Sequence, residues 1–153
     1  MNRSVMLSIH PKWCALIADG RKTVEIRTTR PKIDPPFKCY IYETKSESEI
    51  PWVDEDGHFI FKGRGAVIGE FVCDWIIPII GLSNGIFLPC GETDLKNACL
   101  SNEELIKYFG LMGDGYAWNI SDIVIYDTPR PLSDFGLRRP PQSWCYAKEV
   151  NIV

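Results

Sequence analysis

Residues 20–31 read GRKTVEIRTTRP, a glycine followed by a segment in which apolar and polar side chains alternate. Alternation with a period of two is typical of a β-strand, which we predict over 22–28. The polar positions are mostly charged, with Lys22, Glu25 and Arg27 close together. Such charges can simply keep an edge strand soluble. They can also form the wall of a site that binds a polyanion or a nucleobase, with Lys22 acting as a base if it is buried.

The segments around this strand predict an α+β fold in one domain, residues 1–153. Two helices and five to six strands do not suffice for a doubly wound parallel sheet, and they favour a small β-barrel with the helices at its rim. Residues 45–64 are interpreted as an exposed acidic loop with at most a short hairpin, and 81–99 as an irregular crossing. The other predicted elements are strands over 5–11, 37–44, 65–79, 113–132 and 145–153, and helices over 12–20 and 100–110.

Composition and charge narrow the classes of function. Hydrophobic residues make up 45% of the 153 residues and charged residues 24%, as in globular proteins. No apolar run approaches the roughly 20 residues that span a bilayer, so we expect a cytoplasmic protein without a membrane partner. The net charge of −3 argues against a general nucleic-acid binder. Residues 1–40, however, carry eight basic and three acidic side chains, enough to guide a phosphate chain to a local basic surface.

Cysteine and histidine positions indicate neither a metal site nor a cofactor. The six cysteines include no CxxC pair, so a structural zinc site is not expected. Four of them lie among apolar residues and are interpreted as core residues in a reducing compartment. His10 and His58 are far apart, and no G-x-S-x-G motif is present, which argues against a triad hydrolase. The four cysteines that lie among apolar residues are Cys14, Cys39, Cys73 and Cys145.

Four motifs, in this order along the chain, resemble those of the ASCH domain (activating signal cointegrator homology), in particular its phage and bacterial members. This family belongs to the PUA-like superfamily. The resemblance implies a small PUA-like β-barrel with a cleft lined by the charged residues of the GRKTVEIR run. It also implies binding of RNA or of a nucleotide or nucleoside. The motifs are SIHPKWCALIADG and GRKTVEIR (8–27), GAVIGEFVCDW (65–75), YAWNISDIVIYDTPRPLSDF (116–135) and RRPPQSWCY (138–146).

One small ASCH branch hydrolyses the acetyl amide of N4-acetylcytidine with a lysine, a threonine and a later glutamate. Lys22 matches the lysine, whereas Glu25 stands in the place of the threonine, and the later glutamate has no matched position. An enzyme in the same cleft, either a ribonuclease or an amidohydrolase on a modified nucleoside, is therefore the first alternative. Lys22 and Glu25 would then be its catalytic residues.

The predicted binding site combines polar residues with flat aromatic side chains. A base that stacks on an aromatic ring gains about 1–3 kcal/mol. Three competing interpretations exist: Lys22 is a solvated lysine, Glu25 and Arg27 form a surface ion pair, and the aromatic side chains pack in the core. Trp75 is expected in the core. The second alternative is a protein-interaction module that uses the acidic loop at 47–56. The predicted ligand-binding residues are Lys22, Thr23, Glu25, Arg27, Trp13, Tyr116, Trp118, Ser143 and Trp144.

Overall fold

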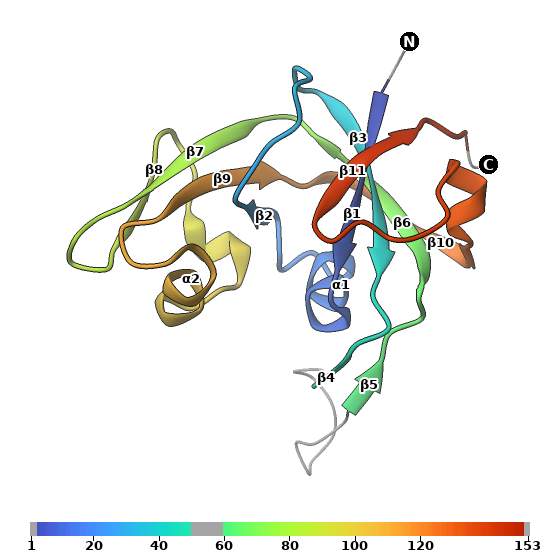
Figure 1. Ribbon diagram of the computed structural model, residues 1–153, viewed down its shortest axis with the longest axis horizontal. Coiled ribbons are helices and arrows are strands. Elements are labelled where there is room, and N and C mark those ends of the chain that lie inside the picture. The colour runs from blue at the N-terminus through green and yellow to red at the C-terminus, as the bar shows by residue number, and fades with distance from the viewer. Residues whose placement is uncertain (1–2, 50–59, 152–153) are drawn as a thin grey trace.

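The computed structural model describes residues 3–49 and 60–151. Most of the acidic loop predicted at 47–56, and the last two residues of the strand predicted over 145–153, lie outside the described residues. A short arm, made of β4 (Glu47–Glu49) and β5 (Ile60–Lys62), confirms the hairpin expected within 45–64. The arm extends away from the body of the molecule below α1 (Figure 1).

The first sheet has five strands in the order β10-β6-β3-β1-β11. Strand β1 pairs in parallel with β3, and the other pairs are antiparallel. Strand β1 is buried along most of its length, as expected for a strand with neighbours on both edges. The five strands are β1 (Arg3–Ile9), β3 (Phe37–Glu43), β6 (Ala66–Cys73), β10 (Ser121–Arg130) and β11 (Trp144–Lys148).

The second sheet has four antiparallel strands in the order β2-β9-β7-β8. The charged strand of the GRKTVEIR run is therefore at a sheet edge, paired with β9 so that Glu25 faces Trp118 across the ladder. The strand predicted over 22–28 is confirmed in a shorter form. The four strands are β2 (Val24–Arg27), β7 (Ile76–Gly81), β8 (Phe87–Pro89) and β9 (Asp114–Asn119).

The chain passes from one sheet to the other at two places. It leaves β6 and enters β7 through Asp74 and Trp75, and it leaves β9 and enters β10 through Ile120. The single strands predicted over 65–79 and 113–132 are therefore wrong, because each run is divided between two sheets. An apolar pattern continues across such a change of sheet, so alternation alone does not reveal it.

Gly69 marks a close approach within the first sheet. A Cβ atom there would lie 2.4 Å from the carbonyl oxygen of Val124 on β10, so only glycine fits. The ladder between β3 and β6 shifts register just beyond this residue, between Ile41 and Tyr42. The irregularity is typical of a β-bulge beside a strand glycine.

The number of strands was underestimated. The two sheets hold nine strands among the described residues, whereas five to six were predicted. Residues 81–99 are also more regular than predicted, because they include β8 and the 3₁₀-helix η1 (Leu95–Ala98). Strands of three residues are too short to show a period. The ladders of the described residues form separate sheets, so the closed barrel stays a prediction.

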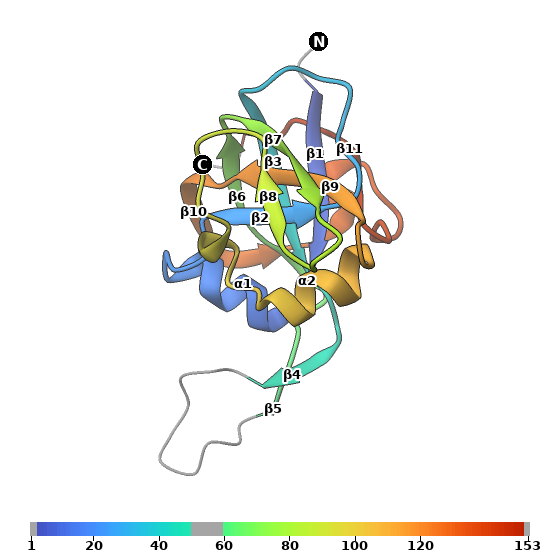
Figure 2. The ribbon, with the colours of Figure 1, turned by 90° about the vertical axis from the view of Figure 1, so that its left-hand side faces the viewer.

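Two α-helices lie on the same side of the sheets (Figures 1 and 2). Helix α1 (Pro11–Ala18) packs Cys14 and Ile17 into the main core, and α2 (Asn102–Phe109) packs Leu105 into a second cluster. A further 3₁₀-helix, η2 (Leu132–Phe135), covers a third cluster. Within the described part of the chain, no helix has the length and apolar character needed to cross a membrane.

Candidate functional site

The turn after α1 directs Lys22 into the molecule. Gly20 has a φ of +86°, a conformation that favours glycine, and it ends the helix as predicted. The backbone N–H of Lys22 then donates to the carbonyl oxygen of Leu16 over 3.0 Å. The side chain is only 1% exposed, and its Nζ donates to the carbonyl oxygen of Ala98 over 2.5 Å. Lys22 is therefore not the solvated lysine of the competing interpretation.

The Lys22 ammonium has two further electrostatic neighbours. It lies 5.1 Å from the centroid of the Trp13 ring and 3.9 Å from Oε1 of Glu25. Burial lowers the pKa of Lys22 below its ordinary value, and the nearby Glu25 carboxylate opposes this shift. A lysine in such surroundings can bind an acceptor atom of a ligand or exchange a proton with it.

Glu25 is the centre of a buried charged network. Its Oε1 accepts a hydrogen bond of 2.8 Å from the backbone N–H of Ile26, and its Oε2 lies 3.7 Å from Nη2 of Arg27. The distances to Lys22 and Arg27 are those of ion pairs without direct hydrogen bonds. The Glu25 side chain is 9% exposed, so the surface ion pair of the competing interpretation is wrong. Its oxygens retain lone pairs for a donor on a ligand.

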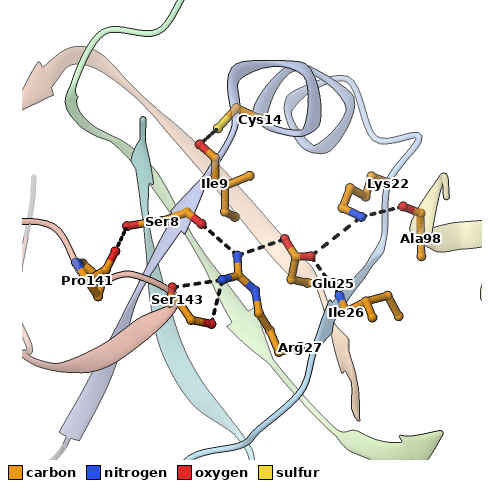
Figure 3. A network of polar contacts seen from close by, with 10 residues as sticks. All are labelled: Ser8, Ile9, Cys14, Lys22, Glu25, Ile26, Arg27, Ala98, Pro141 and Ser143. Atoms are coloured by element: carbon orange, nitrogen blue, oxygen red, sulfur yellow. Dashed lines mark hydrogen bonds and ion pairs between the residues drawn. The ribbon is translucent and has the colours of Figure 1, made fainter. Parts of the chain in front are cut away.

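Arg27 connects three segments of the chain (Figure 3). Its Nη1 donates to the backbone oxygen and to Oγ of Ser143, over 3.0 and 3.1 Å, and its Nη2 donates to the carbonyl oxygen of Ser8 over 2.9 Å. Ser8 also binds the same segment, because its Oγ donates to the carbonyl oxygen of Pro141 over 2.6 Å. Arg27 therefore positions Ser143 beside β2, and most of its guanidinium is occupied by these contacts.

These side chains open onto a cleft of about 660 Å³. Three walls surround it: the start of α1 with β2, the C-terminal half of α2, and the segment that precedes β11. The predicted residues Trp13, Lys22, Glu25, Arg27 and Ser143 are all brought together here. The other residues that line the cleft are Ser8, Ile9, His10, Ile26, Thr28, Leu100, Glu104, Lys107, Tyr108 and Gln142.

The wall formed by α2 was not predicted. Ser101 and Glu104 form a capping box, which fixes the start of the helix. The helix then presents Lys107 and Tyr108 to the cleft, and Tyr108 is 44% exposed. Partial burial raises the pKa of the Tyr108 hydroxyl, which therefore stays protonated at neutral pH. The sequence signal that could have identified this wall was Tyr108, four residues after Glu104 on an amphipathic helix.

Four predicted residues lie outside the cleft of the described chain. Trp118 is fully buried, with its ring against Phe37 and Trp144, so it offers no face to a base. The prediction for this residue is wrong, because β9, in the second sheet, directs the indole into the main core. Tyr116 and Trp144 pack against the same core cluster. The backbone N–H of Thr23 donates a hydrogen bond to the carbonyl oxygen of Asn97.

Charges in the cleft are nearly balanced. Lys22, Arg27 and Lys107 face Glu25 and Glu104, with His10 at the edge. Such a lining suits a ligand with a ring and both donor and acceptor groups better than a bare polyanion. Among the residues that the structure describes, no group of three His, Cys, Asp or Glu side chains converges as a metal site requires.

A second hollow of about 740 Å³ lies between α1 and β10. Its buried charge is Glu43, whose Oε1 accepts a hydrogen bond of 2.8 Å from the backbone N–H of Arg64. Much of the remaining wall consists of small or apolar side chains, including Ala15 and Ala18. The cleft at Lys22 is therefore the stronger candidate, although it is the smaller of the two.

Comparison with known families and structures agrees with the resemblance in the sequence. The model of the ASCH domain matches residues 7–86. A search of curated proteins finds no match.

Similar folds occur among solved structures. The crystal structure of ASCH from Zymomonas mobilis has a TM-score of 0.65 and 21% sequence identity, and the match covers 94% of this chain and 86% of that chain. Structures of two single-residue mutants of the same protein give the same TM-score and identity, with 87% and 88% of those chains covered. At 21% sequence identity, the similarity of this chain to these structures shows the fold alone.

Proposed function

Because the chain belongs to the ASCH domain family, we propose that its cleft binds RNA by taking up one nucleotide or nucleoside unit. The observation that carries the proposal is the buried network of Lys22, Glu25 and Arg27 at the bottom of a cleft with aromatic side chains. Burying three charges is costly, and proteins retain such groups mostly where they serve a site. The PUA-like barrel is the frame that we propose for this cleft.

The roles of the residues follow from their contacts. Trp13 and Tyr108 provide flat faces against which a base stacks. Lys22 donates to an acceptor on the edge of the base, and Glu25 accepts from an amine or imino group. Ser143, oriented by Arg27, donates its hydroxyl proton to the ligand.

The test is the binding of a fluorescein-labelled, mixed-sequence single-stranded RNA of about eight nucleotides, followed by fluorescence anisotropy. Trp13→Leu should weaken binding by about 5- to 150-fold, which corresponds to the loss of one stacked base. Trp75→Leu is the matched control, because Trp75 is also partly buried but packs against the second cluster. Equal effects of the two substitutions, or no binding by the unmodified protein, would contradict the proposal.

A hydrolase in the same cleft is a second candidate, favoured by the burial of Lys22 beside Glu25. An uncharged Lys22 amine can accept a proton from a hydroxyl or a water, and Glu25 can then stabilise the resulting ammonium. Incubation with the same RNA, and separately with N4-acetylcytidine, distinguishes this candidate from binding alone. Products that form with time and disappear in Lys22→Met support a hydrolase, whereas unchanged substrates support a binding function.

A further inference from the structure

His10 lies at the edge of the cleft, between the end of β1 and the start of α1. It occupies the N-cap position of α1, yet its side chain makes no capping hydrogen bond. Its ring instead contacts a pair of hydroxyl groups at the base of the arm. The Nδ1 atom lies 3.0 Å from Oγ of Ser46, which in turn lies 2.5 Å from Oγ1 of Thr44.

The two hydroxyl groups are themselves held in place by the backbone. The N–H of Thr44 donates to the carbonyl oxygen of Ile9 over 3.0 Å, and the N–H of Gly63 donates to the carbonyl oxygen of Ser46 over 3.0 Å. These bonds tie the base of the arm to the end of β1, next to His10. The ring is thus oriented through Nδ1, and within residues 3–49 and 60–151 no group bonds to Nε2, which can therefore contact a ligand.

A hydroxyl pair is an unusual support for a histidine, because each member can either donate or accept. When Nδ1 carries a proton, it donates to Ser46, and Ser46 donates to Thr44. When Nδ1 is unprotonated, the direction reverses, and Ser46 donates to the ring. A backbone carbonyl would stabilise only the first arrangement. The contact therefore persists in both neutral tautomers and in the imidazolium ion.

We infer that His10 is a ligand-contacting residue of the cleft, and that Ser46 and Thr44 position its ring so that Nε2 can either donate or accept a hydrogen bond without breaking the Nδ1 contact. This inference rests on the proposed function, since it assigns a further residue to the same ligand. In the Nδ1–H tautomer, Nε2 accepts a hydrogen bond from a donor on the ligand. In the Nε2–H tautomer, it donates one to an oxygen or nitrogen atom of the ligand.

The test uses nuclear magnetic resonance of the full chain in two samples, one labelled with ¹⁵N-histidine and one with ¹⁵N-tryptophan, in which a Trp13→Leu variant identifies the Trp13 indole signal. The chain has only two histidines, and a His58→Gln variant identifies the His10 signals. The probe is the mixed-sequence single-stranded RNA of about eight nucleotides. We expect saturating RNA to shift the Nε2 signal of His10, with its Nδ1 signal changing less.

Two substitutions separate contact from support. His10→Gln leaves the start of α1 unchanged, because the imidazole does not cap the helix, and it should weaken RNA binding by about three- to tenfold. Ser46→Ala should alter the balance of His10 tautomers in the ¹⁵N spectrum and weaken binding to a smaller extent. Ser83→Ala, in the exposed turn between β7 and β8, is the matched control and should change neither.

The outcomes distinguish this inference from the proposed function. If the RNA shifts the Trp13 indole signal and leaves His10 unchanged, the cleft binds RNA but His10 is not a contact, and the inference is overturned. If neither signal shifts at any RNA concentration, the proposed function fails as well. A His10 tautomer balance that is the same in Ser46→Ala and in the unmodified protein would overturn the positioning role of the hydroxyl pair.

Discussion

Arg27 illustrates how a charged residue can serve a site without contacting its ligand. The Arg27 guanidinium donates hydrogen bonds to the Ser8 carbonyl on β1 and to the carbonyl and hydroxyl of Ser143 before β11. It also forms an ion pair with Glu25. The charged pattern of β2 predicts Arg27 among the residues that bind the ligand directly. The contacts instead make it a support for Ser143 and for the Glu25 carboxylate.

This role predicts a large effect on stability. Arg27→Met should lower the free energy of unfolding by about 3–5 kcal/mol, because it removes the guanidinium from the buried Glu25 carboxylate and from the carbonyl oxygens of Ser8 and Ser143. Arg130→Met is the control, since Arg130 makes an exposed pair with Asp134, and its loss should cost under about 1 kcal/mol. Urea unfolding measures both values. Similar losses in the two variants would contradict the role given to Arg27.

The buried ammonium of Lys22 predicts a dependence of stability on pH. Its pKa in the folded protein lies below the ordinary value of 10.5, so the unfolded chain binds more protons between these two values. The contribution of Lys22 to stability therefore rises with pH and is complete above the ordinary pKa. The unfolding free energy of the unmodified protein, relative to Lys22→Met, should increase as the pH rises toward the ordinary value of 10.5.

Lys148→Met removes an exposed lysine on β11 and is the control for this experiment. Its difference from the unmodified protein should stay constant over the same range of pH. A constant difference for Lys22→Met as well would show that the ammonium is not destabilised in the folded state.

At the scale of elements, α2 depends on a local signal that the sequence displays clearly. The Ser101 hydroxyl accepts from the backbone N–H of Glu104, and the Glu104 carboxylate accepts from the backbone N–H of Ser101. Ser101→Ala should lower the free energy of unfolding by about 1 kcal/mol. Ser83→Ala, outside any helix, should leave it unchanged. Urea unfolding tests both, and an unchanged midpoint for Ser101→Ala would contradict the capping role.

Elements with a strong local pattern were predictable, and those that depend on distant partners were not. The stretch from Pro11 to Arg27 combines a helix, a glycine stop and an alternating strand, and each is present. The divisions at Trp75 and Ile120 escaped prediction, because a strand that changes sheets keeps its apolar alternation. Tyr108 escaped because its place in the cleft depends on how α2 packs against the sheets, some 80 residues after β2.

At the scale of the whole molecule, charge argues for recognition of a base over attraction to a phosphate chain. The net charge is −3, and the cleft carries nearly balanced charges. Of the cations that line the cleft, Lys22 and Arg27 are buried and already paired, which leaves Lys107 as the exposed one. Part of the excess positive charge of residues 1–40 is also neutralised by ion pairs, for example between Lys38 and Glu70.

The affinity for single-stranded RNA should therefore depend only weakly on salt. Each neutralised phosphate contributes a slope of about −0.7 to the logarithmic plot of affinity against salt. We expect a slope of about −1.5 or shallower, which corresponds to one or two phosphates. Anisotropy titrations between about 50 and 200 mM salt measure it. A slope several times steeper would indicate a polyanion surface elsewhere on the molecule.

The most direct test of the account is to locate the bound RNA. Photocrosslinking of a 4-thiouridine-substituted, single-stranded RNA, followed by mass spectrometry, identifies the peptides in contact with its bases. We predict crosslinks at Trp13 and Tyr108, on the α1 and α2 walls of the cleft, and their loss when unlabelled RNA competes. Crosslinks confined to the hollow between α1 and β10, with the cleft peptides unmodified, would contradict it.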